Sequence, residues 1–308
     1  MENILQSIFS AGFLFSVIRI TTPLMYGAMG ALICKQGGVL HIAFEASMLF
    51  SAWFGVAASA LTQNLWVGLL AGVLGGAVTM VIYGYLTIKL NSAAVLTGIA
   101  LNTLASGGTV FLMYMLCGEK GASNSLKSLV FPNVDIPIIR DIPVLGEAIS
   151  GQNILTYIAF ILPIFVYILI FKTPLGLRIR TVGENENAAA SVGINVNKTK
   201  YITLIIGGVV TSLGGIFMSM GYLSWFARDM IAGRGFMAIA AQNLGNAAVL
   251  PTFVTSIFFG LANALAVTLQ TIGLPAEIFQ AFPYVATLIG LAAYSSSLRK
   301  NRKGSSDI

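Results

Sequence analysis

Charged side chains are scarce in this sequence: they make up 9% of its 308 residues, whereas hydrophobic residues make up 56%. Soluble globular domains carry about 25% charged residues, so this composition excludes a soluble domain. The mean hydropathy of +0.86 agrees with that conclusion. Only helices and closed barrels satisfy their backbone hydrogen bonds in lipid. Because the apolar runs are long and continuous rather than alternating, the sequence predicts an all-α, polytopic transmembrane bundle.

Cysteine, histidine and nucleotide-binding motifs are also scarce or absent. The two cysteines, Cys34 and Cys117, are expected near opposite membrane faces and therefore cannot pair with each other. The single histidine, His41, has only Glu45 nearby, which is too few ligands for a metal site. No Gly-x-x-x-x-Gly-Lys-Ser/Thr loop is present to hold phosphates. We therefore expect no resident metal or cofactor and no enzymatic activity, and any ATP-driven step would need another subunit.

The long apolar runs predict the membrane spans, because about 20 apolar residues are needed for a helix to cross the hydrocarbon. Nine runs are found at about 10–33, 38–60, 65–88, 92–117, 153–171, 200–221, 235–249, 251–270 and 278–294. The run at 235–249 is too short for a full crossing, so we expect a half-helix or a re-entrant segment there. Eight to ten membrane segments are therefore predicted.

The positions of Lys and Arg predict the orientation, since cytoplasmic loops near the spans carry the excess of basic residues. With the N-terminus outside, eleven basic residues fall on the cytoplasmic side: Lys35, Lys89, Lys172, Arg178, Arg180, Lys198, Lys200, Arg299, Lys300, Arg302 and Lys303. Only five fall on the other side: Lys120, Lys127, Arg140, Arg228 and Arg234. The C-terminus is then cytoplasmic, and the net charge of +6 reflects topology rather than nucleic-acid binding.

Within this topology, residues 1–308 form a single transmembrane domain with three notable extramembrane parts. Residues 118–152 form an external loop, residues 172–200 a cytoplasmic loop, and residues 295–308 a basic cytoplasmic tail. In the cytoplasmic loop, Asn185 can cap a short alanine-rich helix and Gly193 can end it. A helix of about two turns is not stable alone, so it must rest against something.

Three motifs carry a resemblance to a known family. They are Gly183-Glu184-Asn185-x-x-Ala188-Ala189-x-x-x-Gly193-Ile194, then Gly233-Arg234-Gly235-Phe236-x-Ala238-Ile239-Ala240, and Gly37-Gly38-Val39-Leu40-His41-Ile42-Ala43-Phe44-Glu45. Over about residues 30–295 the chain resembles the permease subunits of bacterial ATP-binding-cassette importers for branched-chain amino acids, simple sugars and nucleosides. It is most similar to the shorter nucleoside or simple-sugar permeases. It departs from that pattern at His41, where Asn is usual, and at Ala43 and Ala46, where Gly is usual.

The resemblance implies both a mechanism and partners. The short cytoplasmic helix would dock into a cleft of an ATP-binding subunit that uses the ATP, with coupling residues Gly183, Glu184, Asn185, Ala188, Ala189, Gly193 and Ile194. The other implied partners are a second permease of unequal length and an external solute-binding protein or lipoprotein. The implied location is the bacterial inner membrane. Nucleosides are the favoured solute, with simple sugars and branched-chain amino acids as alternatives.

Polar residues inside apolar runs are candidates for the solute pathway, because such residues usually face a cavity or one another. If 38–60 is helical, His41 and Glu45 share a face, and they can be a structural pair or contact solute. Arg19 is a candidate partner for Glu45. The amides Asn102, Gln242 and Asn243, like Asn91 and Asn246, can bind sugar hydroxyls or nucleobase edges, or bond helices together.

An internal repeat is a further, weaker signal. An offset of 197 residues places Gly38, Ile42 and Ala43 over Gly235, Ile239 and Ala240, which favours both segments as lining the pathway. Other classes of function stay open. In an ion-coupled secondary transporter, Glu45 and His41 would relay protons, and a passive channel is a further alternative. An intramembrane enzyme is disfavoured because no pair of nucleophile and base is visible.

Overall fold

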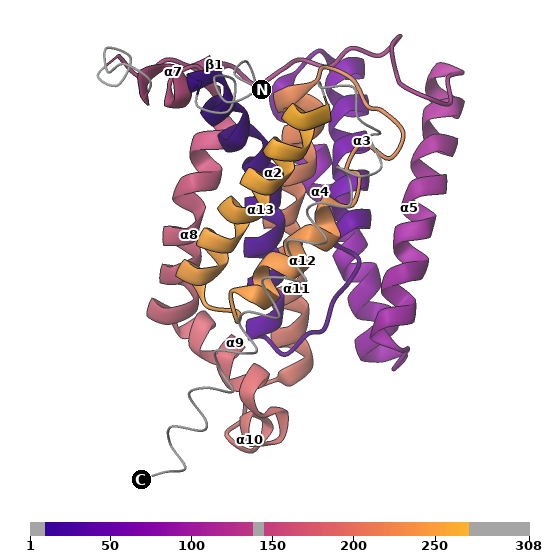
Figure 1. Cartoon of the computed structure of the whole chain (residues 1–308). Helices are drawn as coiled ribbons and strands as arrows, with labels where there is room; N and C mark the ends of the chain where they lie inside the picture. The colour runs from indigo at the N-terminus through magenta and orange to yellow at the C-terminus, as the bar shows by residue number, and fades with distance from the viewer. Residues whose placement is uncertain (1–9, 138–144, 271–308) are drawn as a thin grey trace.

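Seven long helices dominate the structure, a computed structural model that describes residues 10–137 and 145–270 (Figure 1). In this part of the chain, the helices long and apolar enough to cross a membrane are α2 (Ala11–Gln36), α3 (Phe44–Thr62), α4 (Leu65–Gly84), α5 (Ala94–Cys117), α8 (Ile154–Lys172), α11 (Val196–Ile216) and α13 (Val249–Gln270). Two of them continue as short π-helices, α4 into η1 (Tyr85–Lys89) and α11 into η2 (Phe217–Tyr222). The all-α membrane fold is confirmed. The predicted span 278–294, the tail 295–308 and Arg140 lie outside the described residues.

The run at 235–249 forms a short helix, as predicted. Helix α12 (Arg234–Leu244) has 11 residues, which at 1.5 Å per residue is about half of what a crossing needs. It lies obliquely within the bundle (Figure 1). The turn after it reaches the end of the bundle where α2 terminates, since Gln36 Nε2 donates to the Ala247 carbonyl at 2.8 Å. The non-helical residues 223–233 therefore supply the rest of this chain's path across the bundle.

Polar side chains define where several helices begin. The Asn64 side chain accepts hydrogen bonds from two backbone N–H groups at the start of α4. The Asn153 side chain accepts a hydrogen bond from one backbone N–H group at the start of α8. Thr173 caps α9 (Pro174–Glu184), whose first residue is proline, and Asn195 caps α11. Each such cap is worth about 1 kcal/mol. These polar residues separate the apolar runs. The ends of most helices therefore lie within a few residues of the predicted ends of the runs.

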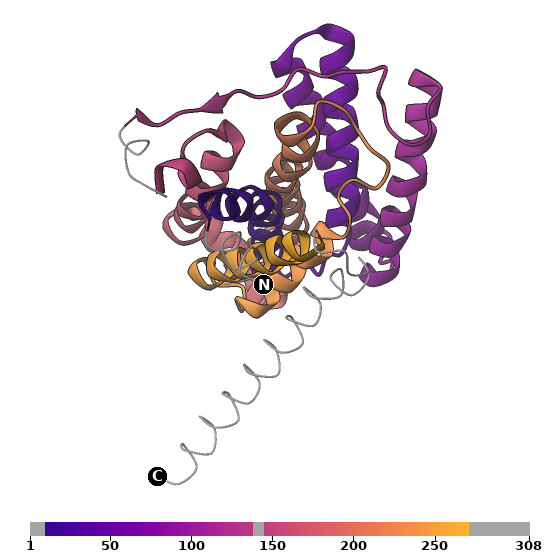
Figure 2. The ribbon, with the colours of Figure 1, turned by 45° about the horizontal axis from the view of Figure 1, so that its top comes forward.

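Helix α2 occupies the middle of the bundle, and α5 stands at its edge (Figure 2). Helix α2 packs against α8, α11, α12 and α13, whereas α5 contacts mainly α3. Glycine permits the closest approach: a Cβ added to Gly30 on α2 would lie 2.7 Å from the Gly207 carbonyl oxygen on α11. Small residues at such contacts are typical of helix association in membranes.

The segment after α5 covers one end of the bundle. Its short strand β1 (Asn133–Val134) pairs antiparallel with β2 (Gln152–Asn153), and the five-residue helix α7 (Leu145–Ile149) lies between them in the chain. Phe131 N donates to the Met220 carbonyl at 2.8 Å, which ties the segment to η2. The opposite end carries α9 and α10 (Glu186–Ser191), which project beyond the other helices (Figure 1).

Candidate functional site

The N-termini of α3 and α12 meet inside the bundle. Each helix follows a non-helical segment, residues 37–43 before α3 and residues 223–233 before α12. The contact is close, because a Cβ added to Gly235 would lie 2.5 Å from the Glu45 backbone nitrogen. Helix N-termini carry partial positive charge and unpaired N–H groups, so the junction needs an acceptor. Interrupted helices of this kind are typical of transporter binding regions.

Glu45 supplies that acceptor. Its Oε1 accepts a hydrogen bond from Gly233 N at 2.8 Å, and its Oε2 accepts one from Gly235 N at 2.7 Å. Gly233 has a φ of 79°, a left-handed conformation that favours glycine. One carboxylate from α3 thus holds the first turn of α12 with two charge-assisted hydrogen bonds.

His41 does not pair with Glu45, so that part of the sequence prediction is wrong. Helix α3 begins at Phe44 rather than near residue 38, which places His41 in the preceding non-helical segment. Its Nδ1 accepts a hydrogen bond from Ala43 N at 3.0 Å, its ring stacks on Tyr83 with centroids 4.1 Å apart, and its Nε2 contacts the Met80 sulfur. His41 is 4% exposed and packs the turn before α3. The structure therefore does not assemble the two groups of the proton-relay alternative.

Asn102 is brought to the same junction from α5. Its Nδ2 donates to the Ile42 carbonyl at 3.2 Å, and its Oδ1 accepts from Ala46 N at 3.0 Å. It therefore bonds α5 to the start of α3. The other two amide candidates lie further along α12, where Gln242 is buried and Asn243 is exposed.

Arginine near the junction comes from α12 rather than α2. Arg234, which the sequence analysis placed among the external loop residues, is the first residue of α12 and donates from Nη1 to the Ile231 carbonyl at 2.8 Å. Arg19 makes no ion pair with Glu45; its guanidinium carbon lies 4.6 Å from the centre of the Tyr222 ring. Arg234 therefore stands beside the Gly235 N–H group that the Glu45 carboxylate holds, although the described residues show no ion pair between the two side chains.

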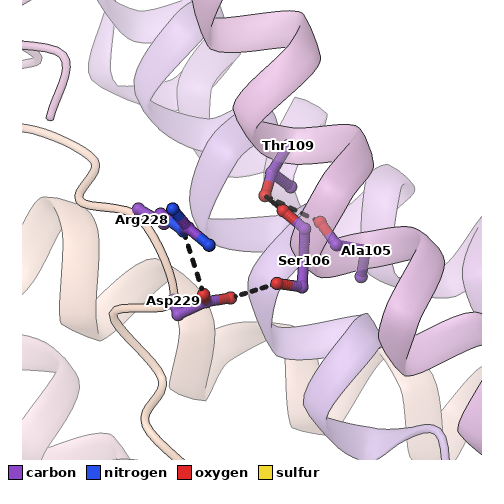
Figure 3. Close-up of polar contacts among 5 residues, drawn as sticks. All are labelled: Ala105, Ser106, Thr109, Arg228 and Asp229. Atoms are coloured by element: carbon purple, nitrogen blue, oxygen red, sulfur yellow. Dashed lines mark hydrogen bonds and ion pairs between the residues drawn. The ribbon is translucent and has the colours of Figure 1, made fainter. Parts of the chain in front are cut away.

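A second polar cluster connects α5 with the segment before α12 (Figure 3). Ser106 Oγ donates to Asp229 Oδ1 at 2.7 Å, and Arg228 Nε lies 3.4 Å from Asp229 Oδ2. The side chains of Arg228 and Asp229 are 64% and 47% exposed, respectively. Ser106 lies near the middle of α5, whose bounds are Ala94 and Cys117. An exposed charged pair at that depth must face a water-filled space or another subunit rather than lipid.

Sequence reasoning missed Ser106 and Asp229 and treated Arg228 as a plain external charge. The signal was present, because residues 223–233 separate two apolar runs and contain both charges directly before the Gly233-Arg234-Gly235 motif. Asp229 has a φ of 51°, a left-handed conformation uncommon outside glycine. Such strained residues gather at functional sites.

The loop at the opposite end contains the predicted short helix. Asn185 caps α10 by accepting from Ala188 N at 3.0 Å, and Lys200 Nζ pairs with Glu186 Oε1 at 2.6 Å. Ala189 is fully buried within this chain, whereas Ala188 is exposed. Of the two alanines named by the motif, only Ala188 therefore presents its side chain to an incoming partner.

The other motif residues of this loop also have defined places. Gly193 has a φ of 81° and turns the chain towards α11, while Glu184 is exposed and Ile194 half-buried. Gly183 lies against the turn that leads to α3, because a Cβ added there would fall 2.1 Å from the Gln36 carbonyl oxygen. The loop thus touches the same non-helical segment that ends at the Glu45 junction.

The His, Cys, Asp and Glu side chains of the described residues are scattered rather than clustered. Within residues 10–137 and 145–270, no group of three or more His, Cys, Asp or Glu side chains lies close enough to hold a metal ion. Cys34 is buried, Cys117 is half-buried, and both are free thiols. The polar groups of this part of the chain hold helices together, as those of Asn102 and Glu45 do.

Comparison with known proteins gives consistent matches along most of the chain. The family model described as "Branched-chain amino acid transport system / permease component" matches residues 13–291. The nucleoside ABC transporter permease protein NupC of Lactococcus lactis is 30% identical over 89% of both chains. The guanosine ABC transporter permease protein NupQ of Bacillus subtilis is 32% identical over 88% of both chains. Among solved structures, PsaBC from Streptococcus pneumoniae in complex with Fab has a similar fold, with a TM-score of 0.52, 16% identity and 94% coverage of both chains.

Proposed function

The chain belongs to the branched-chain amino acid transport system permease family, and on that basis we propose that it moves nucleosides across a bacterial inner membrane. It is a multi-pass membrane permease subunit of an ATP-binding-cassette transporter. The proposal that the solute is a nucleoside is supported by two relatives, whose names specify nucleosides and guanosine and which are 30% and 32% identical to this chain over most of its length.

The observation that carries the proposed pathway is the exposed Asp229 carboxylate at mid-depth of α5. A carboxylate accepts hydrogen bonds from neutral hydroxyl groups, and a nucleoside offers two adjacent hydroxyls on its ribose. Ser106 fixes one carboxylate oxygen at 2.7 Å, and Arg228 Nε lies 3.4 Å from the other. We infer that solute passes along this side of α5, where a second permease subunit would complete the pathway.

The proposed route of coupling runs from α10 to the Glu45 junction. Movement of an ATP-binding subunit against the exposed face of α10 would push Gly183 against the turn at Gln36. That turn continues directly into α3, which holds α12 through Glu45. Movement at the ATP-binding subunit would then reach the pathway residues Glu45 and Asn102 through the coupling loop. The coupling residues of that loop are Gly183, Glu184, Asn185, Ala188, Ala189, Gly193 and Ile194.

The proposed assembly contains this permease, a second and longer permease, a pair of ATP-binding subunits that use the ATP, and an external solute-binding protein. The chain itself then has no ATPase activity. Lys35, Lys89, Lys172 and Lys198 lie at helix ends on the side of α10, so the excess of basic residues supports placing that end in the cytoplasm. The covering segment formed by residues 118–137 and 145–153 would then lie on the external side.

Asp229→Asn tests both the solute class and the pathway. The neutral amide is a weaker acceptor and loses its pairing with Arg228. We therefore expect the KM for radiolabelled guanosine to rise by about tenfold, which is equivalent to about 1.4 kcal/mol. The measurement is initial uptake by the assembled transporter in proteoliposomes. Unlabelled nucleosides should compete with uptake in the unmodified transporter, while glucose and leucine should not.

The matched control is Asp135→Asn, the same chemical change in the covering segment near β1, which should leave the KM unchanged. Competition by glucose or leucine in place of nucleosides would contradict the solute class. A normal KM in Asp229→Asn together with normal competition by nucleosides would contradict the placement of the pathway while leaving the solute class intact.

A further inference from the structure

A small cavity next to the Glu45 junction contains two guanidinium groups. It has a volume of about 120 Å³ and is lined by Arg19, Tyr222 and Arg234 together with apolar side chains of α2, η2 and α13. Arg19 comes from the half of α2 that is remote from α10, and Tyr222 is the last residue of η2. The cavity therefore lies towards the end of the bundle opposite α10, and neither the coupling route nor the proposed solute pathway uses it.

Arg19 is held in this cavity by an aromatic ring rather than by an acid. Its guanidinium carbon lies 4.6 Å from the centre of the Tyr222 ring, a cation–π contact. In the described residues, the only ion pairs are Lys200 with Glu186 and Arg228 with Asp229. Arg19 thus places a guanidinium group in an apolar part of a membrane helix without a carboxylate partner, an arrangement that is costly unless an anion is supplied from elsewhere.

The hydrogen-bond donors of the Arg234 guanidinium are only partly satisfied. Its Nη1 donates to the carbonyls of Met230 and Ile231, at 3.4 Å and 2.8 Å. Its Nε is buried and has no hydrogen-bond partner. The Glu45 carboxylate nearby already accepts one hydrogen bond at each oxygen, from Gly233 N and Gly235 N. A buried donor without an acceptor is rare in folded proteins and calls for an explanation.

Two guanidinium groups, those of Arg19 and Arg234, line the cavity. Arg234 begins the helix whose N–H groups the Glu45 carboxylate holds, whereas Arg19 has no carboxylate partner among the described residues, so the pair leaves an excess of one positive charge. The Nε–Nη2 edge of a guanidinium is the edge that binds two oxygens of a phosphate or carboxylate side by side. A phosphodiester carries a single negative charge at neutral pH, which matches the excess. It is also the anion that a bilayer supplies along the surface of any membrane protein, attached to chains that suit the apolar walls.

We propose that the cavity formed by Arg19, Tyr222 and Arg234 binds a phosphate group, carried by a lipid headgroup or by a free phosphate ion. The phosphate oxygens accept hydrogen bonds from Arg234 Nε and from the free edge of Arg19. Binding ties α2 to the start of α12 and adds to the stability of the Glu45 junction. The proposal concerns the chemistry of this cavity alone and holds whichever solute the transporter carries.

Thermal unfolding of the full chain in its assembled transporter tests this site with four additions: phosphatidylglycerol, a diacylglycerol of the same chains without phosphate, sodium phosphate, and sodium chloride at equal ionic strength. A ligand that binds only the folded state raises the melting temperature with its concentration, which gives an apparent Kd. We expect phosphatidylglycerol to raise the melting temperature and diacylglycerol and chloride to have no effect. If sodium phosphate also raises the melting temperature, the site binds the free ion. If only phosphatidylglycerol raises it, the site binds a lipid headgroup. Both results support the proposal.

Variants separate this cavity from general lipid effects. Arg19→Gln removes one guanidinium without touching the bonds of α12, and we expect the apparent Kd of the phosphate probe to weaken by at least about tenfold. Lys127→Gln, the same loss of charge in the exposed covering segment, should bind like the unmodified protein. The proposal is overturned if no phosphate-bearing addition stabilises the unmodified protein, or if Arg19→Gln and Lys127→Gln respond equally.

Discussion

Glu45→Gln is expected to reduce uptake by at least about tenfold and to lower the free energy of unfolding by about 1–3 kcal/mol. The carboxylate accepts hydrogen bonds from Gly233 N at 2.8 Å and Gly235 N at 2.7 Å. An amide has only one oxygen, so one of these N–H groups would face a second donor. Arg234 would also lose the nearest negative charge. The measurements are the melting temperature of the purified transporter and its initial rate of nucleoside uptake.

Glu147→Gln is the matched control, since Glu147 is exposed on α7 at the end of the bundle. It should leave both quantities unchanged. Glu45→Asp is a second informative variant, because it keeps the charge but shortens the side chain by one methylene, and it should fall between the two. Normal stability and normal uptake in Glu45→Gln would mean that the junction of α3 and α12 does not depend on this carboxylate.

The second large effect is expected from Ala188→Arg on α10. Ala188 is exposed and small, and the helix is held in place by the Asn185 cap and by the buried Ala189. A long charged side chain at this point cannot enter a cleft that fits alanine without burying an unpaired charge. We expect recovery of the ATP-binding subunit with the tagged permease to fall by at least about tenfold, and nucleoside uptake to fall with it.

The control for this substitution is Gly121→Arg. Gly121 also has open space around it, but it lies in the covering segment at the opposite end of the bundle. This variant should retain the ATP-binding subunit. Full recovery of that subunit with Ala188→Arg, accompanied by full uptake, would rule out α10 as the docking element.

Much of the fold could be predicted because membrane helices are defined by long apolar runs and by the polar residues between them. The short length of α12 followed from the same reasoning. The start of α3 could not be predicted, since an apolar run inside a membrane was assumed to be helical from about residue 38. The structure instead keeps residues 37–43 non-helical. Their carbonyl groups find partners from other helices, such as Tyr83 Oη, which donates to the Leu40 carbonyl at 2.5 Å.

The candidate site could be predicted only in part, for a related reason. Glu45 stood out as an ionisable residue in an apolar run, yet its partners are backbone N–H groups 188 and 190 residues away in the chain. The 197-residue offset of the internal repeat does not align equivalent structures either. It places Gly38, which lies in the non-helical segment before α3, over Gly235, which lies within α12. Asp229 was missed because its loop was assigned to the external face. Contacts between distant non-helical segments depend on tertiary packing, and one sequence does not reveal them.

Uptake of radiolabelled nucleoside into proteoliposomes, with and without ATP and the ATP-binding subunits, tests the central claim most directly. The assembled transporter should take up nucleoside only when the ATP-binding subunits, ATP and the solute-binding protein are all present. A protonophore should have no effect on that uptake. Uptake by this permease without the ATP-binding subunits, abolished by the protonophore, would contradict the account and favour an ion-coupled carrier.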